Sequence, residues 1–159
     1  MSKTKMICIS GIIMAMYIVI MFATQGFAFG AYQIRIATAL YALSYPLPFL
    51  VLPLALANML ANAMGPMGIW DMLGGFVIGL ITSGGVYLVR RFHWPMILVI
   101  PVIILAPAFI VPIWLSYILG VPYFMLVISL AIGQTLPAIV GYLLIKILSN
   151  HVKRMGLDG

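Results

Sequence analysis

The chain has 159 residues, of which 65% are hydrophobic and only 6% are charged. A soluble domain carries about a quarter charged residues, so this composition excludes one and predicts an all-α integral membrane protein with a single transmembrane domain, residues 1–159. A net charge of +6 is also typical of nucleic-acid-binding proteins. We assign it to the positive-inside bias of membrane proteins instead, because the basic residues fall where loops are expected.

The first apolar run extends from Met6 to about Ala23, which is long enough to cross a membrane. We expect a retained helix rather than a signal peptide, because no cleavage site leads into a soluble domain. Gly11 and Ala15 form a small-xxx-small pair on this helix, which allows another helix to approach closely. The approaching helix could belong to the same subunit or to another protein, and residue chemistry leaves both possibilities open.

The next apolar run, Ile36 to Met64, is too long for one ordinary span and short for two. Two short helices, roughly 35–46 and 48–64 with a turn near Pro46, give the better charge distribution. Seven of the eight basic residues then lie on one side of the membrane, and Arg35 is the exception. We therefore predict six transmembrane helices with the N- and C-termini in the cytoplasm.

Three further helices complete the predicted bundle: Ile69 to Val89, Met96 to about Leu119, and Tyr123 to about Leu148. The second of them contains three prolines, which membrane helices tolerate, and it is expected to bend. The first presents a small-residue surface that favours tight helix packing. That surface consists of Gly74, Gly75, Gly79, Gly84 and Gly85.

Polar residues converge on the predicted outer face. Asn58 and Asn62 are one helical turn apart and share a face. Asp71 follows in the first turn of the next helix, and it could simply pair with Arg35 across the outer mouth. Trp114 has an ordinary alternative as an aromatic-belt residue. The candidate binding residues are Gln33, Arg35, Asn58, Asn62, Trp70, Asp71, Trp114 and Gln134.

Catalysis has little support in this inventory of two histidines, one cysteine and two acidic residues. The chain has no phosphate-binding Gly-rich Lys motif, so we expect it not to hydrolyse ATP itself and not to be an enzyme. No metal or cofactor site is expected. A small ion-coupled secondary carrier is an alternative to a binding protein, and Asp71 would then be its only available coupling group.

Three segments carry a family resemblance: Gln33 to Leu40, Leu56 to Asp71, and Gly133 with Gln134. In order and spacing they resemble the QueT family, whose members are small membrane substrate-binding (S) components of energy-coupling-factor (ECF) transporters. The resemblance runs from about Gly11 to Lys146. It implies an S-component-like six-helix bundle, multi-pass in the plasma membrane of a prokaryote.

The resemblance also implies a function and partners. The ligand would be a deazaguanine-type queuosine precursor captured at the extracellular face, and another vitamin-like small molecule is the alternative. An ECF transmembrane coupling (T) subunit and two cytoplasmic ATPase subunits would drive its ATP-dependent uptake, so the chain itself needs no cofactor. Gly11 and Ala15 would then form the face that docks the coupling subunit.

The chemistry of the candidate residues suits such a ligand. A carboxylate at Asp71 could accept two N–H donors of a guanine-like edge, and the carboxamides of Asn58, Asn62 and Gln134 could complement the rest. Trp70 or Trp114 could cover the ring. Thr38 and Gln134 stand where the family is usually acidic, which favours a precursor with less positive charge.

Overall fold

The computed structural model describes residues 1–28 and 33–154, and the side chains of 150–154 are outside this description. Only helices and their connections occur in the described residues. In chain order the helical elements are α1 (Lys3–Ala23), α2 (Gln25–Ala28), η1 (Ile36–Ser44), η2 (Pro48–Leu50), α3 (Val51–Ala63), α4 (Gly68–Arg91), η3 (Met96–Leu98), α5 (Val99–Ile110), α6 (Pro112–Leu119) and α7 (Tyr123–Arg154).

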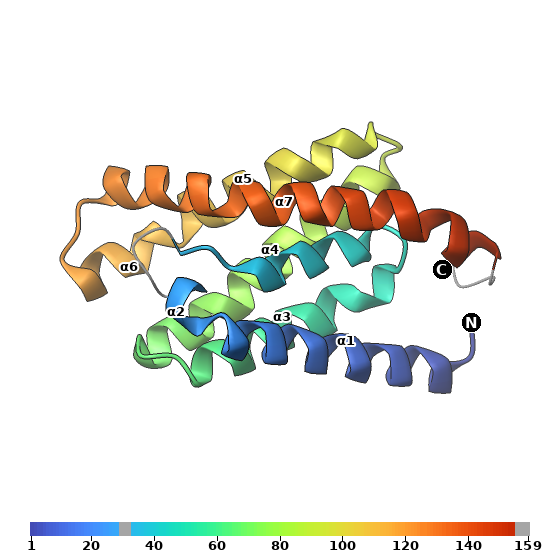
Figure 1. Cartoon of the computed structure of the whole chain (residues 1–159), viewed down its shortest axis with the longest axis horizontal. Helices are drawn as coiled ribbons and strands as arrows, with labels where there is room; N and C mark the ends of the chain where they lie inside the picture. Colours follow the sequence, from blue (N-terminus) through green and yellow to red (C-terminus); the bar gives the residue numbers. More distant parts are fainter. Residues whose placement is uncertain (29–32, 155–159) are drawn as a thin grey trace.

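The helices run back and forth along one long axis, so that α1 begins at the end of the bundle where α7 finishes (Figure 1). The turn between α4 and η3 lies at the same end. There Arg90 Nη1 donates hydrogen bonds of 2.9 Å to the carbonyl oxygens of Tyr45 and Pro46, the residues that follow η1. Arg90 therefore lies at the end of the bundle where α1 begins, which is where the basic residues were predicted to gather. Whether that end faces the cytoplasm stays a prediction.

Helix length and composition support fewer membrane crossings than the six predicted. Three helices, α1, α4 and α7 up to Ser149, are long and apolar enough to cross a membrane. The pair α5–α6 counts as a fourth span if its 42° bend is allowed. The helix Pro48–Ala63 is shorter, and η1 has nine residues. At about 2.0 Å per residue, η1 covers roughly 18 Å of the hydrocarbon core, which is about 30 Å thick.

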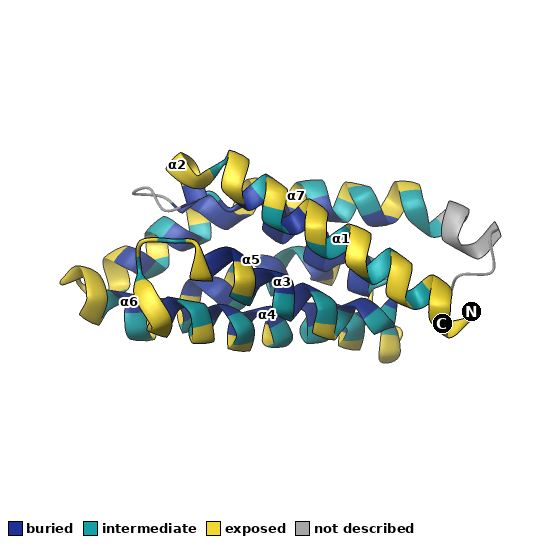
Figure 2. Ribbon diagram, turned by 90° about the horizontal axis from the view of Figure 1, so that it is seen from below, coloured by how far each residue is buried: buried dark blue, intermediate teal, exposed yellow. Residues whose placement is uncertain are grey.

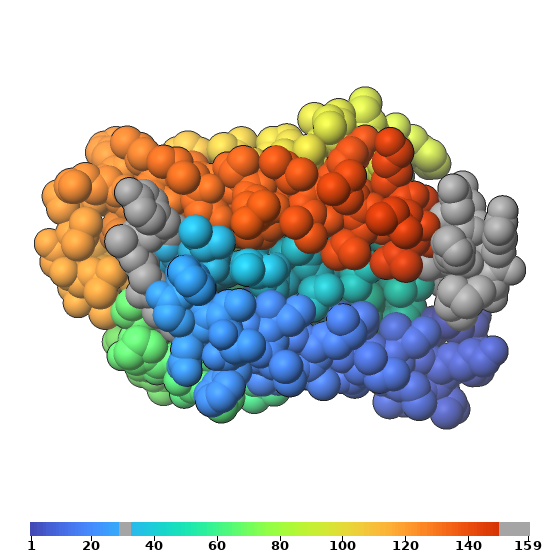
Figure 3. Space-filling view, in the orientation of Figure 1, coloured from blue at the N-terminus to red at the C-terminus, as the bar shows by residue number. Residues whose placement is uncertain are grey.

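The division of the second apolar run into two helices is confirmed, with η1 in place of 35–46 and Pro48–Ala63 in place of 48–64. η1 is a 3₁₀ helix, which is uncommon at this length. Its residues 37–44 are all buried, because η1 packs against α7, α1 and α4. Its atoms fill the seam between α1 and α7 on the face seen in Figure 3.

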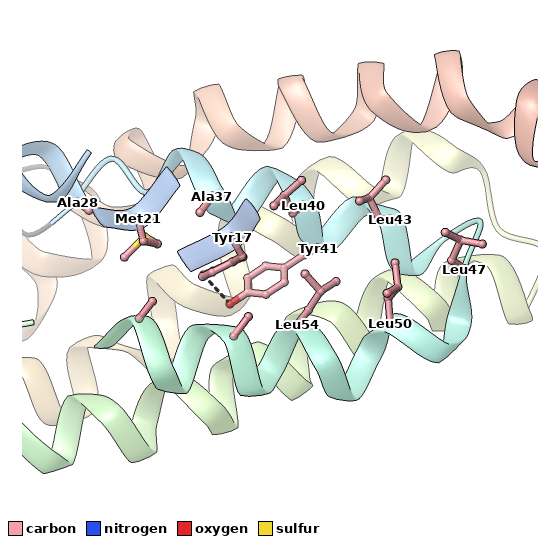
Figure 4. Close-up of a cluster of buried hydrophobic side chains, with 12 residues drawn as sticks. Tyr17, Met21, Ala28, Ala37, Leu40, Tyr41, Leu43, Leu47, Leu50 and Leu54 are labelled. Carbon is pink, nitrogen blue, oxygen red and sulfur yellow. Dashed lines mark hydrogen bonds between the residues drawn. The ribbon is translucent and has the colours of Figure 1, made fainter. Parts of the chain in front are cut away.

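The buried residues of η1, α1 and α3 form one apolar cluster, shown in Figure 4. Tyr17 of α1 and Tyr41 of η1 lie at its centre. Small residues allow η1 to approach its other neighbours closely. A Cβ atom added at Gly141 of α7 would lie 2.9 Å from the carbonyl oxygen of Ala39. The narrow helix is therefore in close backbone contact with α7, and its Tyr41 packs against Tyr17 of α1.

The small-residue pair on α1 faces outward. Gly11 and Ala15 are both exposed, and a Cβ atom at Gly11 would meet no atom within 4 Å. Most of α1 is exposed or half-buried in Figure 2, while Tyr17 and Met21 are its buried residues. Of the two possibilities for this pair, packing within the same subunit is therefore wrong for the described residues.

The small-residue surface of α4 is confirmed at four of its five positions. A Cβ atom at Gly79 would lie 2.7 Å from Ala55 Cα, so α3 and α4 are in close contact there. Gly74, Gly75 and Gly85 are also closely approached by side chains of neighbouring helices. The prediction is wrong for Gly84, where a Cβ atom would meet nothing within 4 Å. That position faces away because it lies five residues beyond Gly79 on the helix.

The predicted bend in the fifth helix is confirmed at Val111, between α5 and α6. Pro112 follows the bend, and a proline ring cannot continue the hydrogen-bond ladder of the preceding helix. The bend turns α6 toward the start of α4. It thereby positions Trp114 near Asp71.

Candidate ligand-binding site

A buried ion pair joins the start of η1 to the first turn of α4. Arg35 Nη2 lies 3.5 Å from Asp71 Oδ2, and the side chains are only 6% and 1% exposed. Buried charges are costly unless they are paired, so each of these residues depends on the other. The pairing weighed from the sequence is therefore confirmed. Asp71 is also the only acidic residue in 1–28 and 33–154, since the other acid of the chain is Asp158.

Asn62 of α3 holds both members of this ion pair. Its Oδ1 accepts a hydrogen bond of 3.2 Å from Arg35 Nη1, and its Nδ2 donates one of 3.0 Å to the carbonyl oxygen of Asp71. Both ends of the carboxamide are therefore engaged by protein groups. Asn62 therefore fixes the positions of Arg35 and Asp71 relative to each other.

Trp114 of α6 approaches the carboxylate from the other side. The indole Nε1 donates a hydrogen bond of 3.1 Å to Asp71 Oδ1. This approach depends on Gly74, because a Cβ atom there would lie 2.5 Å from the indole Cζ2. Trp114 is therefore part of the polar cluster and not an ordinary aromatic-belt residue. Both oxygens of Asp71 are in contact with protein groups.

Asn58 lies one turn before Asn62 on α3 and is 1% exposed. Its Nδ2 donates a hydrogen bond of 2.8 Å to the carbonyl oxygen of Gly75. Its Oδ1 has no hydrogen-bond partner among the described residues. The two asparagines thus share a face, as predicted, but they differ in that only Asn58 keeps an unused polar atom.

Gln134 of α7 is connected to η1 through Thr38. Thr38 Oγ1 lies 2.7 Å from Gln134 Oε1 and 2.7 Å from the carbonyl oxygen of Arg35. A hydroxyl carries one hydrogen and can donate to only one acceptor at a time. Both contacts can be hydrogen bonds at once if Thr38 Oγ1 donates to the Arg35 carbonyl oxygen and accepts from the Gln134 NH₂ group. The Gln134 oxygen then points away from Thr38. The hydrogen-bond partners of an amide group determine which end is nitrogen and which is oxygen, because the two atoms are nearly equal in size.

Four of these polar side chains line a small internal cavity. Its lining residues come from η1, α3, α4, α5, the α5–α6 bend and α7. They are Arg35, Thr38, Tyr41, Asn58, Ile78, Pro107, Val111, Leu130 and Gln134. Few polar groups among apolar walls are typical of a ligand pocket. The cavity volume is about 10 Å³, which is room for about one water molecule. A ligand as large as a bicyclic base therefore requires the surrounding helices or side chains to move apart.

Tyr17 and Tyr41 extend the polar cluster to α1, as Figure 4 shows. Their hydroxyl oxygens are 3.1 Å apart, and their ring centroids are 5.7 Å apart. Both side chains are buried, and Tyr41 lines the cavity. The two tyrosines were not among the predicted binding residues, and Thr38 was noted only as a departure from the family pattern. A sequence signal for the tyrosines was present, because each places a hydroxyl group inside an otherwise apolar run.

Two of the predicted binding residues lie apart from the cavity lining. Trp70 is adjacent to Asp71 in the chain, but its side chain is 68% exposed. Successive helix positions are about 100° apart, so burial of Asp71 turns Trp70 outward. Gln33 is buried and has a positive φ of 44°, and its Oε1 has no hydrogen-bond partner among the described residues. Of the other six candidates, three line the cavity, namely Arg35, Asn58 and Gln134. Asn62 and Asp71 contact Arg35, and Trp114 contacts Asp71.

The described residues contain no group of three or more His, Cys, Asp or Glu side chains that could hold a metal ion. A family model described as QueT transporter matches residues 7–150, a range that includes every cavity-lining residue. No curated protein and no solved structure matches the chain.

Proposed function

Because the chain belongs to the QueT transporter family, we propose that it is the substrate-binding (S) component of an ECF-type ABC importer and captures a deazaguanine-type queuosine precursor. The observation that supports a binding role is the cavity lined by Arg35, Asn58 and Gln134 inside an otherwise apolar bundle. Polar groups are costly inside a membrane protein unless they are paired or used. A deazaguanine offers hydrogen-bonding edges for such groups and a flat apolar ring for the walls.

The energy for uptake would come from partner subunits. We propose a transmembrane coupling subunit and two cytoplasmic ATPase subunits, because the sequence has no ATP-binding motif of its own. The exposed Gly11 and Ala15 of α1 offer a close-packing surface to a helix of the coupling subunit. The cell would be a prokaryote and the membrane its plasma membrane, with the cavity end of the bundle facing outward.

The proposal is tested by ligand binding to the purified chain in detergent, measured by calorimetry. The panel contains deazaguanine precursors together with thiamine, riboflavin, biotin and pantothenate. Asp71→Asn runs alongside because it removes the charge that fixes Arg35 at the cavity. Arg91→Gln is the matched control, since it also removes one charge but lies exposed at the opposite end of the bundle.

Binding of one deazaguanine that is weakened at least about tenfold in Asp71→Asn and unchanged in Arg91→Gln supports the proposal. Binding of a vitamin instead supports an S component with another small-molecule ligand and contradicts the proposed substrate. Co-purification with an ATPase pair tests the partners separately. Uptake that depends on a proton gradient and needs no ATPase would favour a small ion-coupled carrier instead.

A further inference from the structure

The carboxamide of Asn58 is engaged at one end only. Its Nδ2 donates to the carbonyl oxygen of Gly75 over 2.8 Å, and the side chain lines the cavity. Its Oδ1 is fully buried and has no hydrogen-bond partner among the described residues. Buried polar atoms are nearly always hydrogen-bonded, so an unused acceptor beside a cavity requires an explanation.

The contact with Gly75 determines which end of the amide is free. A carbonyl oxygen can only accept, so the amide end that faces Gly75 must be the NH₂ group. The contact is held in place by the close approach of α3 and α4. A Cβ atom at Gly75 would lie 2.5 Å from Asn62 Nδ2. The oxygen of Asn58 is therefore an acceptor without a partner among the described residues, and the side chain that carries it lines the cavity.

We propose that Asn58 Oδ1 is the acceptor that recognises the guanine-like edge of the ligand. This inference rests on the proposed function and specifies which atom reads the base. The ring N–H and the exocyclic amino group of a guanine-type base are adjacent donors. One amide oxygen has two lone pairs and can accept from both. Asn58 is thus a specificity-determining residue for bases that carry the amino group.

Asp71 is less suited to this task than the sequence suggested. Its Oδ1 accepts from Trp114 over 3.1 Å, and its Oδ2 lies 3.5 Å from Arg35 Nη2. Asp71 is also not among the cavity-lining residues, whereas Asn58 is. Asn58 Oδ1 accepts a ligand donor without breaking any hydrogen bond in the protein.

The test uses a matched pair of uncharged compounds and the full chain in detergent. One compound is a guanine-type 7-deazapurine nitrile, and the other is its 2-deamino, hypoxanthine-type counterpart. They differ in a single amino group. Uncharged probes are chosen because Arg35 and Asp71 already offset each other, so that neither compound brings a net charge into the cavity.

Calorimetry on the unmodified chain is the primary measurement. The amino compound is expected to bind at least about tenfold more tightly, because the deamino compound leaves the buried acceptor less satisfied. In Asn58→Leu this preference is expected to fall to less than about threefold. The carbonyl oxygen of Gly75 keeps its ordinary partner within α4 in this variant, so the helix pair should remain folded. Asn58→Ala is the second variant if Asn58→Leu does not fold.

Thr82→Val is the control, because Thr82 is a buried hydroxyl of α4 that is not among the cavity-lining residues. It is expected to keep the full preference for the amino compound. Equal binding of the two compounds to the unmodified chain would overturn the inference and leave the proposed function standing. An unchanged preference in a folded Asn58 variant would also overturn it. Failure of every deazapurine to bind would instead contradict the proposed function.

Discussion

Trp114 donates its indole N–H to Asp71 Oδ1 over 3.1 Å, and this hydrogen bond joins α6 to the first turn of α4. The two residues are 43 positions apart in the chain and meet only because the helix bends at Val111. Val111, at this bend, is also part of the cavity lining.

Trp114→Phe removes the indole donor and keeps an aromatic ring at the position. We expect the free energy of unfolding to fall by about 1–3 kcal/mol, because a buried carboxylate oxygen loses its hydrogen bond. Thermal unfolding in detergent measures the change. Trp94→Phe is the control, since Trp94 is exposed in the loop after α4 and should change stability by less than about 0.5 kcal/mol. Equal effects of the two substitutions would contradict the prediction.

Removing one member of the ion pair should destabilise the chain more than removing both. Asp71→Asn leaves Arg35 buried without its carboxylate, and a loss of about 3–5 kcal/mol is expected for such a broken pair. The double variant Arg35→Gln/Asp71→Asn should recover a large part of that loss, because no uncompensated charge remains. Denaturant unfolding of the single and double variants forms a double-mutant cycle. Additive losses would show that the two charges are not coupled.

Gly79 and Gly84 provide a matched pair on α4. Gly79→Ala places a methyl group 2.7 Å from Ala55 Cα, so α3 must shift and the free energy of unfolding should decrease by about 1–3 kcal/mol. Gly84→Ala meets no atom within 4 Å and replaces glycine in a helix interior, so stability should rise by up to about 1 kcal/mol. Melting temperatures of the two variants are compared directly. A stabilising Gly79→Ala would contradict the close packing of α3 and α4.

Cysteine labelling tests whether η1 and α3 cross the membrane. The background variant is Cys8→Ala, because Cys8 is exposed and would react itself. A cysteine at Tyr45 is expected to react from the same side of the membrane as one at Phe92, because Arg90 holds the Tyr45 carbonyl at that end of the bundle. A cysteine at Tyr117, which is 90% exposed at the other end, should react from the opposite side. Protection of Tyr45→Cys from both sides would support fewer than six crossings.

Gly11→Leu tests the proposed docking surface on α1. The larger side chain meets no atom of the same chain, so the free energy of unfolding should change by less than about 0.5 kcal/mol. Co-purification with the coupling subunit should decrease, because the side chain prevents close approach of another helix. Ile12→Leu is the control, since it keeps the volume of an exposed residue on the same helix. Undiminished co-purification of Gly11→Leu would rule out this face as the docking surface.

The sequence alone determined the class of protein, most helix boundaries and most members of the polar cluster. Apolar runs, prolines and the two asparagines of α3 act through local chemistry, and local chemistry is readable one segment at a time. The turn after η1 was found in this way, as were Arg35, Asn58, Asn62 and Asp71. The expected bend near Pro112 and the close-packing surface of α4 also followed from residue type.

Only the tertiary structure decided how these segments are rotated against one another. It placed Trp114 on Asp71 and turned the neighbouring Trp70 outward, although both are tryptophans near the same end of the bundle. It left Gly11 exposed and buried Gly79 against Ala55. It also distinguished Asn58, with a free oxygen, from Asn62, with both ends engaged. Helical periodicity indicates which residues share a face, but the partner of that face depends on contacts between segments far apart in the chain.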